Sequence, residues 1–162
     1  MNNLVPVDHS AMKTNQAVII TLLLVAFIFN QPWLVGVVCL VMLAGSVVLK
    51  RPGFGILYTS VLKPAKIVKP DLLQDNREPH VFAQLVGGIF LFASTAALFL
   101  GSALIGWVLS WIVIALASLN LFAGFCVGCA MYYWLHQINV PGFDRGAPAG
   151  AFPGMRPGKS QG

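Results

Sequence analysis

Four long apolar segments constrain the fold of this chain more than any other feature of its sequence. Of the 162 residues, 57% are hydrophobic and only 9% are charged, whereas a soluble domain usually carries about 25% charged residues. A helix needs roughly 20 apolar residues to cross the hydrocarbon core of a bilayer. The sequence therefore predicts an all-α, four-helix transmembrane bundle in contact with lipid, with spans at about residues 9–29, 33–49, 81–100 and 103–135.

The connections between the spans predict two tight antiparallel hairpins. Residues 30–32 separate the first two spans, and residues 101–102 separate the last two. The charged, proline-containing stretch 50–53 ends the second span, since a helix in lipid cannot continue through it. Residues 50–80 then form a long loop between the hairpins, which we expect to lie on the membrane surface. Together these elements predict a membrane domain over residues 1–136.

Basic residues fall on one side of this four-span arrangement. All ten Lys and Arg residues lie in the N-terminal segment, in the loop over residues 50–80 or in the tail after residue 136, and the two hairpin connections have none. Cytoplasmic connections of membrane proteins are enriched in Lys and Arg. We therefore expect the loop and both termini to be cytoplasmic. The same distribution lacks the basic stripe that nucleic-acid binding needs, so we expect no nucleic-acid partner.

The last apolar run is too long for one untilted crossing. As a single helix, residues 103–135 would extend roughly 50 Å at about 1.5 Å per residue. Either this helix projects from the membrane, or it bends near Asn120 or Gly124, where a polar or side-chain-free residue interrupts the run. The Gly- and Pro-rich residues 137–162 that follow predict a flexible, disordered tail, with docking on a partner as the alternative.

Two of the three cysteines lie near the end of this run. Cys126 and Cys129 are three positions apart, which places both thiols on one face of a helix and permits a disulfide. A helix N-terminus stabilises a thiolate, so a break at Gly124 favours a redox-active or sulfur-carrying pair. If the helix instead continues, Gly124 and Gly128 form a seam of small residues for helix packing.

Metal binding is a third interpretation of the cysteine pair. A zinc site needs two further ligands, and His9, His80 and His136 are the histidines of the chain. The sequence has no second CxxC and no HxxxH, so we predict no metal site, and no cofactor can be identified. Cys39 should lie far from the pair, as a small core residue.

Four polar side chains lie within or near the apolar segments. Asn15, Gln16 and Gln84 should gather at the cytoplasmic end of the bundle. Together with Asn120, they are candidates for hydrogen bonds between helices or for the lining of a small cavity beside the cysteines. No Asp, Glu, Lys or Arg lies deep within the apolar segments, which argues against an ion-coupled transporter or a proton pump.

Three short motifs frame the apolar segments. They are Asp8 with Asn15 and Gln16, Pro-x-x-Phe-Ala-Gln at residues 79–84, and Phe-Cys-x-Gly-Cys at residues 125–129. Over roughly residues 6–136, the chain thereby resembles a bacterial family of small four-span membrane proteins of unknown function. The resemblance implies a multi-pass protein of a bacterial inner (cell) membrane.

The resemblance also implies thiol or sulfur chemistry, because the family is associated with thioredoxin-like or rhodanese-like partners. We therefore expect Cys126 and Cys129 to be a candidate redox pair that faces the cytoplasm. The pair would cycle between dithiol and disulfide, or carry sulfur, in exchange with such a partner. The alternative is a non-catalytic accessory subunit of a larger membrane protein complex. Small size and the absence of buried charge fit this alternative equally well, so the sequence leaves open whether the protein is an enzyme.

Overall fold

A computed structural model describes residues 5–50, 53–55, 58–62, 71–144, 146–147 and 152–156. Among these residues, four helices are long and apolar enough to cross a membrane. They are α1 (His9–Ile28), α2 (Pro32–Ala44) with the π-helical turn η1 (Gly45–Leu49), α4 (Arg77–Phe99), and α5 (Ala103–Ser118) with the π-helical turn η3 (Leu119–Ala123). The expected all-α bundle is confirmed, and the chain is a multi-pass membrane protein.

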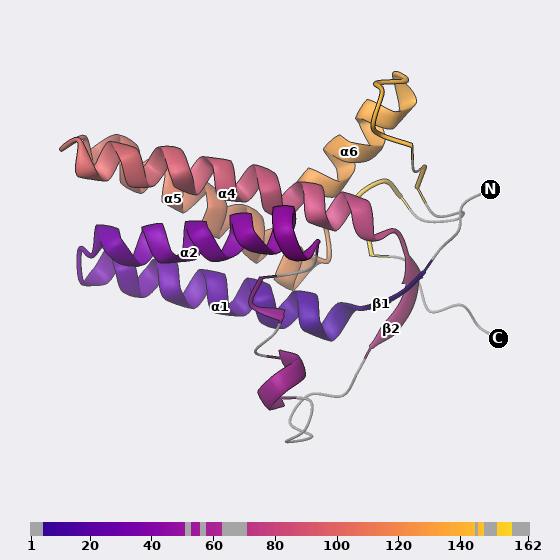
Figure 1. Ribbon diagram of the computed structural model, residues 1–162, viewed down its shortest axis with the longest axis horizontal. Helices are drawn as coiled ribbons and strands as arrows, with labels where there is room; N and C mark the ends of the chain where they lie inside the picture. Colours follow the sequence, from indigo (N-terminus) through magenta and orange to yellow (C-terminus); the bar gives the residue numbers. More distant parts are fainter. Residues whose placement is uncertain are drawn as a thin grey trace.

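The four spanning helices form a ring of antiparallel neighbours (Figure 1). Helix α1 packs on α2 and α5, and α4 packs on the same two helices. The short links at residues 29–31 and 100–102 lie together at one end of the ring, here called the hairpin end. The opposite end, here called the site end, carries a fifth helix, α6 (Val127–Gln137).

Apolar side chains fill the middle of the ring and also cover its outside. Leu23 and Leu91 are fully buried between the helices. Cys39 is buried in the same core, with its Sγ 3.4 Å from the carbonyl oxygen of Gly88. Large apolar residues such as Leu104 are exposed on the outer surface. A helix that is apolar on all sides is typical of a membrane span, because lipid covers its outer face.

A short two-stranded ribbon lies at the site end, which the sequence did not lead us to expect. Strand β1 (Val5–Asp8) pairs antiparallel with β2 (Leu72–Asp75). Asp8 at the end of β1 also caps α1, since its Oδ1 accepts a hydrogen bond from the backbone N–H of Ser10 at 3.0 Å. The ribbon thus ties the segment before α4 to the start of α1 and fixes the place of Asp75.

The connection over residues 50–80 is described in part. The π-helical turn η2 (Tyr58–Leu62) lies against α1. The backbone N–H of Phe54 donates to Asn15 Oδ1 at 2.9 Å. Residues 63–70, which carry the lysines that we expect at the membrane surface, lie outside the described residues.

The last apolar run turns sharply at Gly124. Turn η3 ends at Ala123, Gly124 has a φ of +67°, and α6 begins at Val127. Glycine adopts this left-handed conformation without the strain that a Cβ would add. Helix α6 leaves the ring at an angle to α5 (Figure 1). The sequence left open whether residues 103–135 form one projecting helix or a helix that bends. The structure shows a bend at Gly124.

Candidate functional site

Cys126 and Cys129 form a disulfide at the start of α6. Their Cα atoms are 5.2 Å apart, which is within the usual range for disulfides. Cys126 is the N-cap residue of α6, and its Sγ accepts a hydrogen bond from the backbone N–H of Cys129 at 3.2 Å. The break at Gly124 thus places both sulfurs at a helix N-terminus, where unpaired N–H groups and the helix dipole stabilise a thiolate after reduction.

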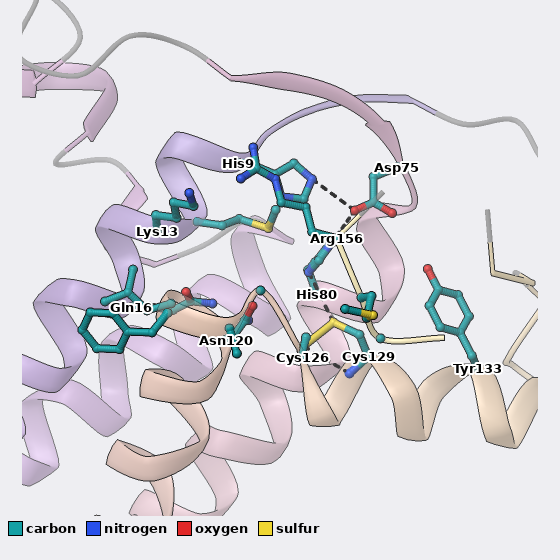
Figure 2. Close-up of a pocket in the computed structure, with 17 residues that line it drawn as sticks. His9, Lys13, Gln16, Asp75, His80, Asn120, Cys126, Cys129, Tyr133 and Arg156 are labelled. Atoms are coloured by element: carbon teal, nitrogen blue, oxygen red, sulfur yellow. Dashed lines mark hydrogen bonds and ion pairs between the residues drawn. A yellow bond between two sulfur atoms is a disulfide. The ribbon is translucent and has the colours of Figure 1, made fainter. Parts of the chain in front are cut away.

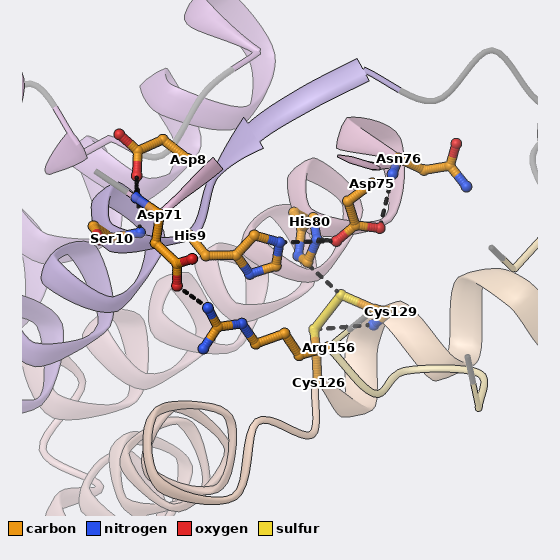
Figure 3. A network of polar contacts seen from close by, with 10 residues as sticks. All are labelled: Asp8, His9, Ser10, Asp71, Asp75, Asn76, His80, Cys126, Cys129 and Arg156. Carbon is orange, nitrogen blue, oxygen red and sulfur yellow. Dashed lines mark hydrogen bonds and ion pairs between the residues drawn. A yellow bond between two sulfur atoms is a disulfide. The ribbon is translucent and has the colours of Figure 1, made fainter. Parts of the chain in front are cut away.

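His80 connects the disulfide to a buried carboxylate (Figure 3). Its Nδ1 lies 3.3 Å from Cys129 Sγ, and its Nε2 lies 2.9 Å from Asp75 Oδ2. When Nε2 donates its proton to the carboxylate, Nδ1 is left as an acceptor. In the reduced pair, His80 is therefore placed to take a proton from the thiol of Cys129.

Asp75 lies between two imidazoles and is only 3% exposed. His9 Nε2 lies 3.2 Å from the same oxygen that contacts His80, although without the alignment of a hydrogen bond. The backbone N–H of Asn76 donates to Asp75 Oδ1 at 2.8 Å. Burial alone raises the pKa of Asp75, but its contacts with His80 and His9 outweigh burial and hold that pKa well below the usual range. Asp75 is therefore ionised at neutral pH and can orient the His80 ring.

The disulfide forms part of the wall of a cavity of about 340 Å³, here called the polar chamber (Figure 2). The chamber lies at the site end, between α1, η3 and the start of α6. Cys126 and Cys129 line it, although they are only 5% and 2% exposed. Gln16 and Asn120 line it too, as does Lys13. A small water-soluble group in the chamber would thus meet the sulfurs in polar surroundings.

A segment of the tail, residues 152–156, holds the turn that carries the cysteines. The carbonyl oxygen of Gly154 accepts a hydrogen bond from the backbone N–H of Cys126 at 2.8 Å. The backbone N–H of Arg156 donates to the carbonyl of Gly124 at 3.1 Å, and its guanidinium forms an ion pair with Asp71 (Figure 3). The sequence predicts a flexible tail over residues 137–162, and residues 152–156 are a part of it that contacts this turn.

Two sets of side chains in the described part of the chain could hold a metal ion. One combines His80 with Cys126 and Cys129, and the other combines His80 with His9 and Asp75. The ligand atoms of each set lie within 4.8 Å of one another. The two sulfurs are joined in a disulfide here and are not available as thiolate ligands. His136 is not part of either set, since its Nδ1 contacts the carbonyl oxygen of Phe143 at 2.7 Å.

The sequence reasoning missed the role of Asp75 and considered His80 only as a metal ligand. Asp75 precedes α4 and His80 lies in its first turn, five positions later in the sequence. Nothing in the sequence indicated that α6 would bring Cys129 against this turn. The structure therefore places an imidazole beside the sulfurs that the cysteine spacing alone does not reveal.

Residues 7–137 match the family described as a domain of unknown function (DUF4395). The match includes the four spanning helices, His80 and both cysteines of the disulfide, whereas the tail segment 152–156 lies beyond it. No curated protein and no solved structure matches the chain.

Proposed function

Since the chain belongs to the DUF4395 family, whose function is unknown, we propose a function from the site itself: reversible thiol–disulfide exchange at Cys126 and Cys129. The exchange partner is a soluble cytoplasmic protein with its own dithiol, of thioredoxin-like or rhodanese-like type. One observation carries the proposal, namely the disulfide at a helix N-terminus with His80 Nδ1 at 3.3 Å from Cys129 Sγ. A pair that served only helix packing would need no such titratable neighbour.

Each step of the exchange has a group in place to assist it. A partner thiol gives its proton to His80 Nδ1 and attacks Cys126 Sγ as a thiolate. A mixed disulfide forms, and the departing sulfur of Cys129 takes that proton back from His80. The second partner thiolate then breaks the mixed disulfide and releases Cys126, whose thiolate keeps the hydrogen bond from the Cys129 N–H. Two electrons pass from the partner dithiol to the pair, and the partner leaves as a disulfide.

The partner must reach two sulfurs that are nearly buried. Cys126 is covered in part by the tail, through the hydrogen bond between its N–H and Gly154. The proposal therefore includes a movement of residues 152–156 away from the disulfide when the partner docks. When the segment moves, water can take the place of the lost partner in this hydrogen bond and in the one between Arg156 and Gly124.

The site end faces the cytoplasm in this proposal, in a bacterial inner membrane. Four basic residues of the described structure lie at this end: Lys13 near the start of α1, Lys50 directly after η1, Arg77 at the start of α4, and Arg156, which is bonded to Gly124. The remaining basic residues belong to the same connections in the sequence, and the hairpin links have none. This charge distribution supports a cytoplasmic site end.

A trapping experiment tests the exchange directly. In the Cys129→Ser variant, the thiolate of Cys126 should attack the disulfide between thionitrobenzoate and a thioredoxin-like protein that keeps only one active-site cysteine. The mixed disulfide of the two proteins should persist, because neither retains a second thiol to resolve it. Cys39→Ser is the matched control and should exchange fully without a trapped species, because Cys39 is buried in the bundle core. The accessory-subunit alternative predicts instead that the double Ser variant of Cys126 and Cys129 behaves normally in cells and co-purifies stoichiometrically with a larger complex.

A further inference from the structure

A second cavity runs from Cys126 and the β1–β2 ribbon into the ring of helices. Its volume is about 440 Å³, and it lies between α1, α4, α5 and α6. We call it the apolar shaft. Its inner part is lined by the apolar residues Ile19, Met42, Phe90, Val113 and Leu116.

The shaft reaches about half-way through the membrane. Ile19 lies ten positions after His9 in α1, which corresponds to roughly 15 Å at about 1.5 Å per residue, and the hydrocarbon core is about 30 Å thick. Val113 and Met42 at this depth belong to the buried core. The amide residues that line the shaft, such as Gln84 and Asn120, lie nearer the site end. A ligand of the shaft therefore needs an apolar body and a polar head.

The polar chamber and the apolar shaft meet at the disulfide. Cys126 and His80 line both cavities, as do Gln16 and Asn120. A molecule in the shaft and a water-soluble thiol in the chamber can thus both reach Cys126. The amide N–H groups of Gln16 and Asn120 are donors suited to a carbonyl oxygen at the mouth of the shaft.

We propose that the apolar shaft binds a membrane quinone and that the quinone oxidises the dithiol of Cys126 and Cys129. This inference rests on the proposed exchange function and names its second substrate. A quinone has the apolar tail that the shaft fits and a ring head that takes two electrons and two protons. The volume lies in the range of about 300–1,000 Å³ that is usual for small-molecule sites.

The reaction balances between the thiol pair and the quinone. The Cys129 thiol and the Cys126 thiolate lose one proton and two electrons as the S–S bond forms. The quinone gains these two electrons, that proton and a second proton from water at its two carbonyl oxygens to give a quinol. His80 Nδ1 accepts the proton of Cys129, and Asp75 stabilises the resulting imidazolium. The soluble dithiol partner then reduces the disulfide again, so that electrons flow from partner to quinone.

The test uses the purified full chain in detergent, reduced completely, freed of reductant and mixed with decylubiquinone without oxygen. We expect one quinone consumed for each disulfide formed, measured by quinone absorbance and by thiol alkylation. Val113→Phe should narrow the shaft and slow oxidation by the quinone roughly ten-fold or more, since overpacking a buried site is unfavourable. Ile112→Phe is the matched control, because Ile112 is 38% exposed on the outer face of the same helix; its rate should not change.

Diamide, a water-soluble thiol oxidant, separates the possible outcomes. It should oxidise wild type, Val113→Phe and Ile112→Phe at equal rates, which shows that each variant is folded around an intact pair. If diamide acts but decylubiquinone leaves the wild-type thiols unchanged, the quinone inference is wrong and the exchange function stands. Equal quinone rates for Val113→Phe and wild type also overturn the inference. If Val113→Phe does not fold, Leu116→Phe tests the same shaft. Leu116 is as exposed as Ile112, at 38%, but its side chain lines the shaft.

Discussion

The Nδ1 atom of His80 lies 3.3 Å from the Sγ atom of Cys129, although 49 positions separate the two residues in the sequence. A close crossing of α4 and α6 makes this contact. A Cβ added at Gly128 in α6 would lie 2.5 Å from the Cβ of Ala83 in α4, so the approach depends on a glycine there. The first turn of α4 thereby meets the N-terminus of α6 at the disulfide.

Replacing His80 should slow the reduction and reoxidation of the cysteine pair. In His80→Ala, Cys129 loses the imidazole that exchanges a proton with its sulfur, and we expect rates near neutral pH to fall roughly 100-fold. Single-turnover reduction by dithiothreitol at one neutral pH, followed by alkylation of the thiols, measures the effect. His136→Ala is the control, since His136 contacts Phe143 rather than the sulfurs. Equal rates for His80→Ala and wild type would remove His80 from the mechanism.

Asp75→Asn should destabilise the protein in a pH-dependent manner. The pKa of Asp75 is lower in the folded chain than the ordinary value near 4, so its ionised form stabilises the fold. That contribution is fully present above about pH 4 and is lost as the pH falls below this value. Thermal unfolding in detergent should therefore give a lower melting temperature for Asp75→Asn than for wild type at pH 7. This difference in melting temperature should shrink as the pH falls below about 4. A difference for Asp75→Asn that stays constant as the pH falls below about 4 would contradict the account.

Gly124→Ala tests the break between α5 and α6. The added Cβ has space, since its nearest neighbour is the Cβ of Arg156 at 3.8 Å, so only the φ of +67° causes strain. We expect a loss of about 1–2 kcal/mol in stability for Ala. Asn tolerates this conformation better, so Gly124→Asn should lose clearly less. Equal melting temperatures for the Ala variant and wild type would mean that the chain does not turn here.

Gly154→Ala should expose the cysteines by loosening the tail segment. A Cβ at Gly154 would lie 2.7 Å from the Cβ of Ala130 and 2.9 Å from the carbonyl oxygen of Cys126. Gly142 has a positive φ as well, but a Cβ there meets nothing within 4 Å, so Gly142→Ala is the matched control. We expect faster maleimide labelling of the reduced pair in Gly154→Ala and an unchanged rate in Gly142→Ala. Identical labelling of both variants would show that residues 152–156 do not control access.

The spanning helices could be predicted because their signals are local. Apolar length defines each span, and the breakers at residues 30–32, 50–53 and 101–102 end or separate them. Gly124 was one of two candidate positions for a bend, since a glycine permits a left-handed turn but does not require one. Whether the run 103–135 broke there depended on contacts that its sequence does not contain, including the hydrogen bond from Arg156.

The polar part of the site could not be predicted because it is assembled over long distances in the sequence. The ion pair between Arg156 and Asp71 joins residues 85 positions apart. The ribbon of β1 and β2 sets Asp75 beside His9, and neither strand has a pattern strong enough to predict its pairing in four residues. Cysteine spacing therefore indicated Cys126 and Cys129 as a candidate pair, whereas His80 beside them and the tail segment against them became visible only in the fold.

An equilibrium redox titration of Cys126 and Cys129 tests the central proposal most directly. Native membranes are equilibrated in a series of reduced and oxidised glutathione mixtures, and the free thiols of the two residues are alkylated and quantified by mass spectrometry. Reversible exchange predicts that the pair changes from disulfide to dithiol within this series, along a two-electron curve, and returns when the series is reversed. A pair that stays fully oxidised throughout, as structural disulfides do, or fully reduced throughout, would contradict a redox function.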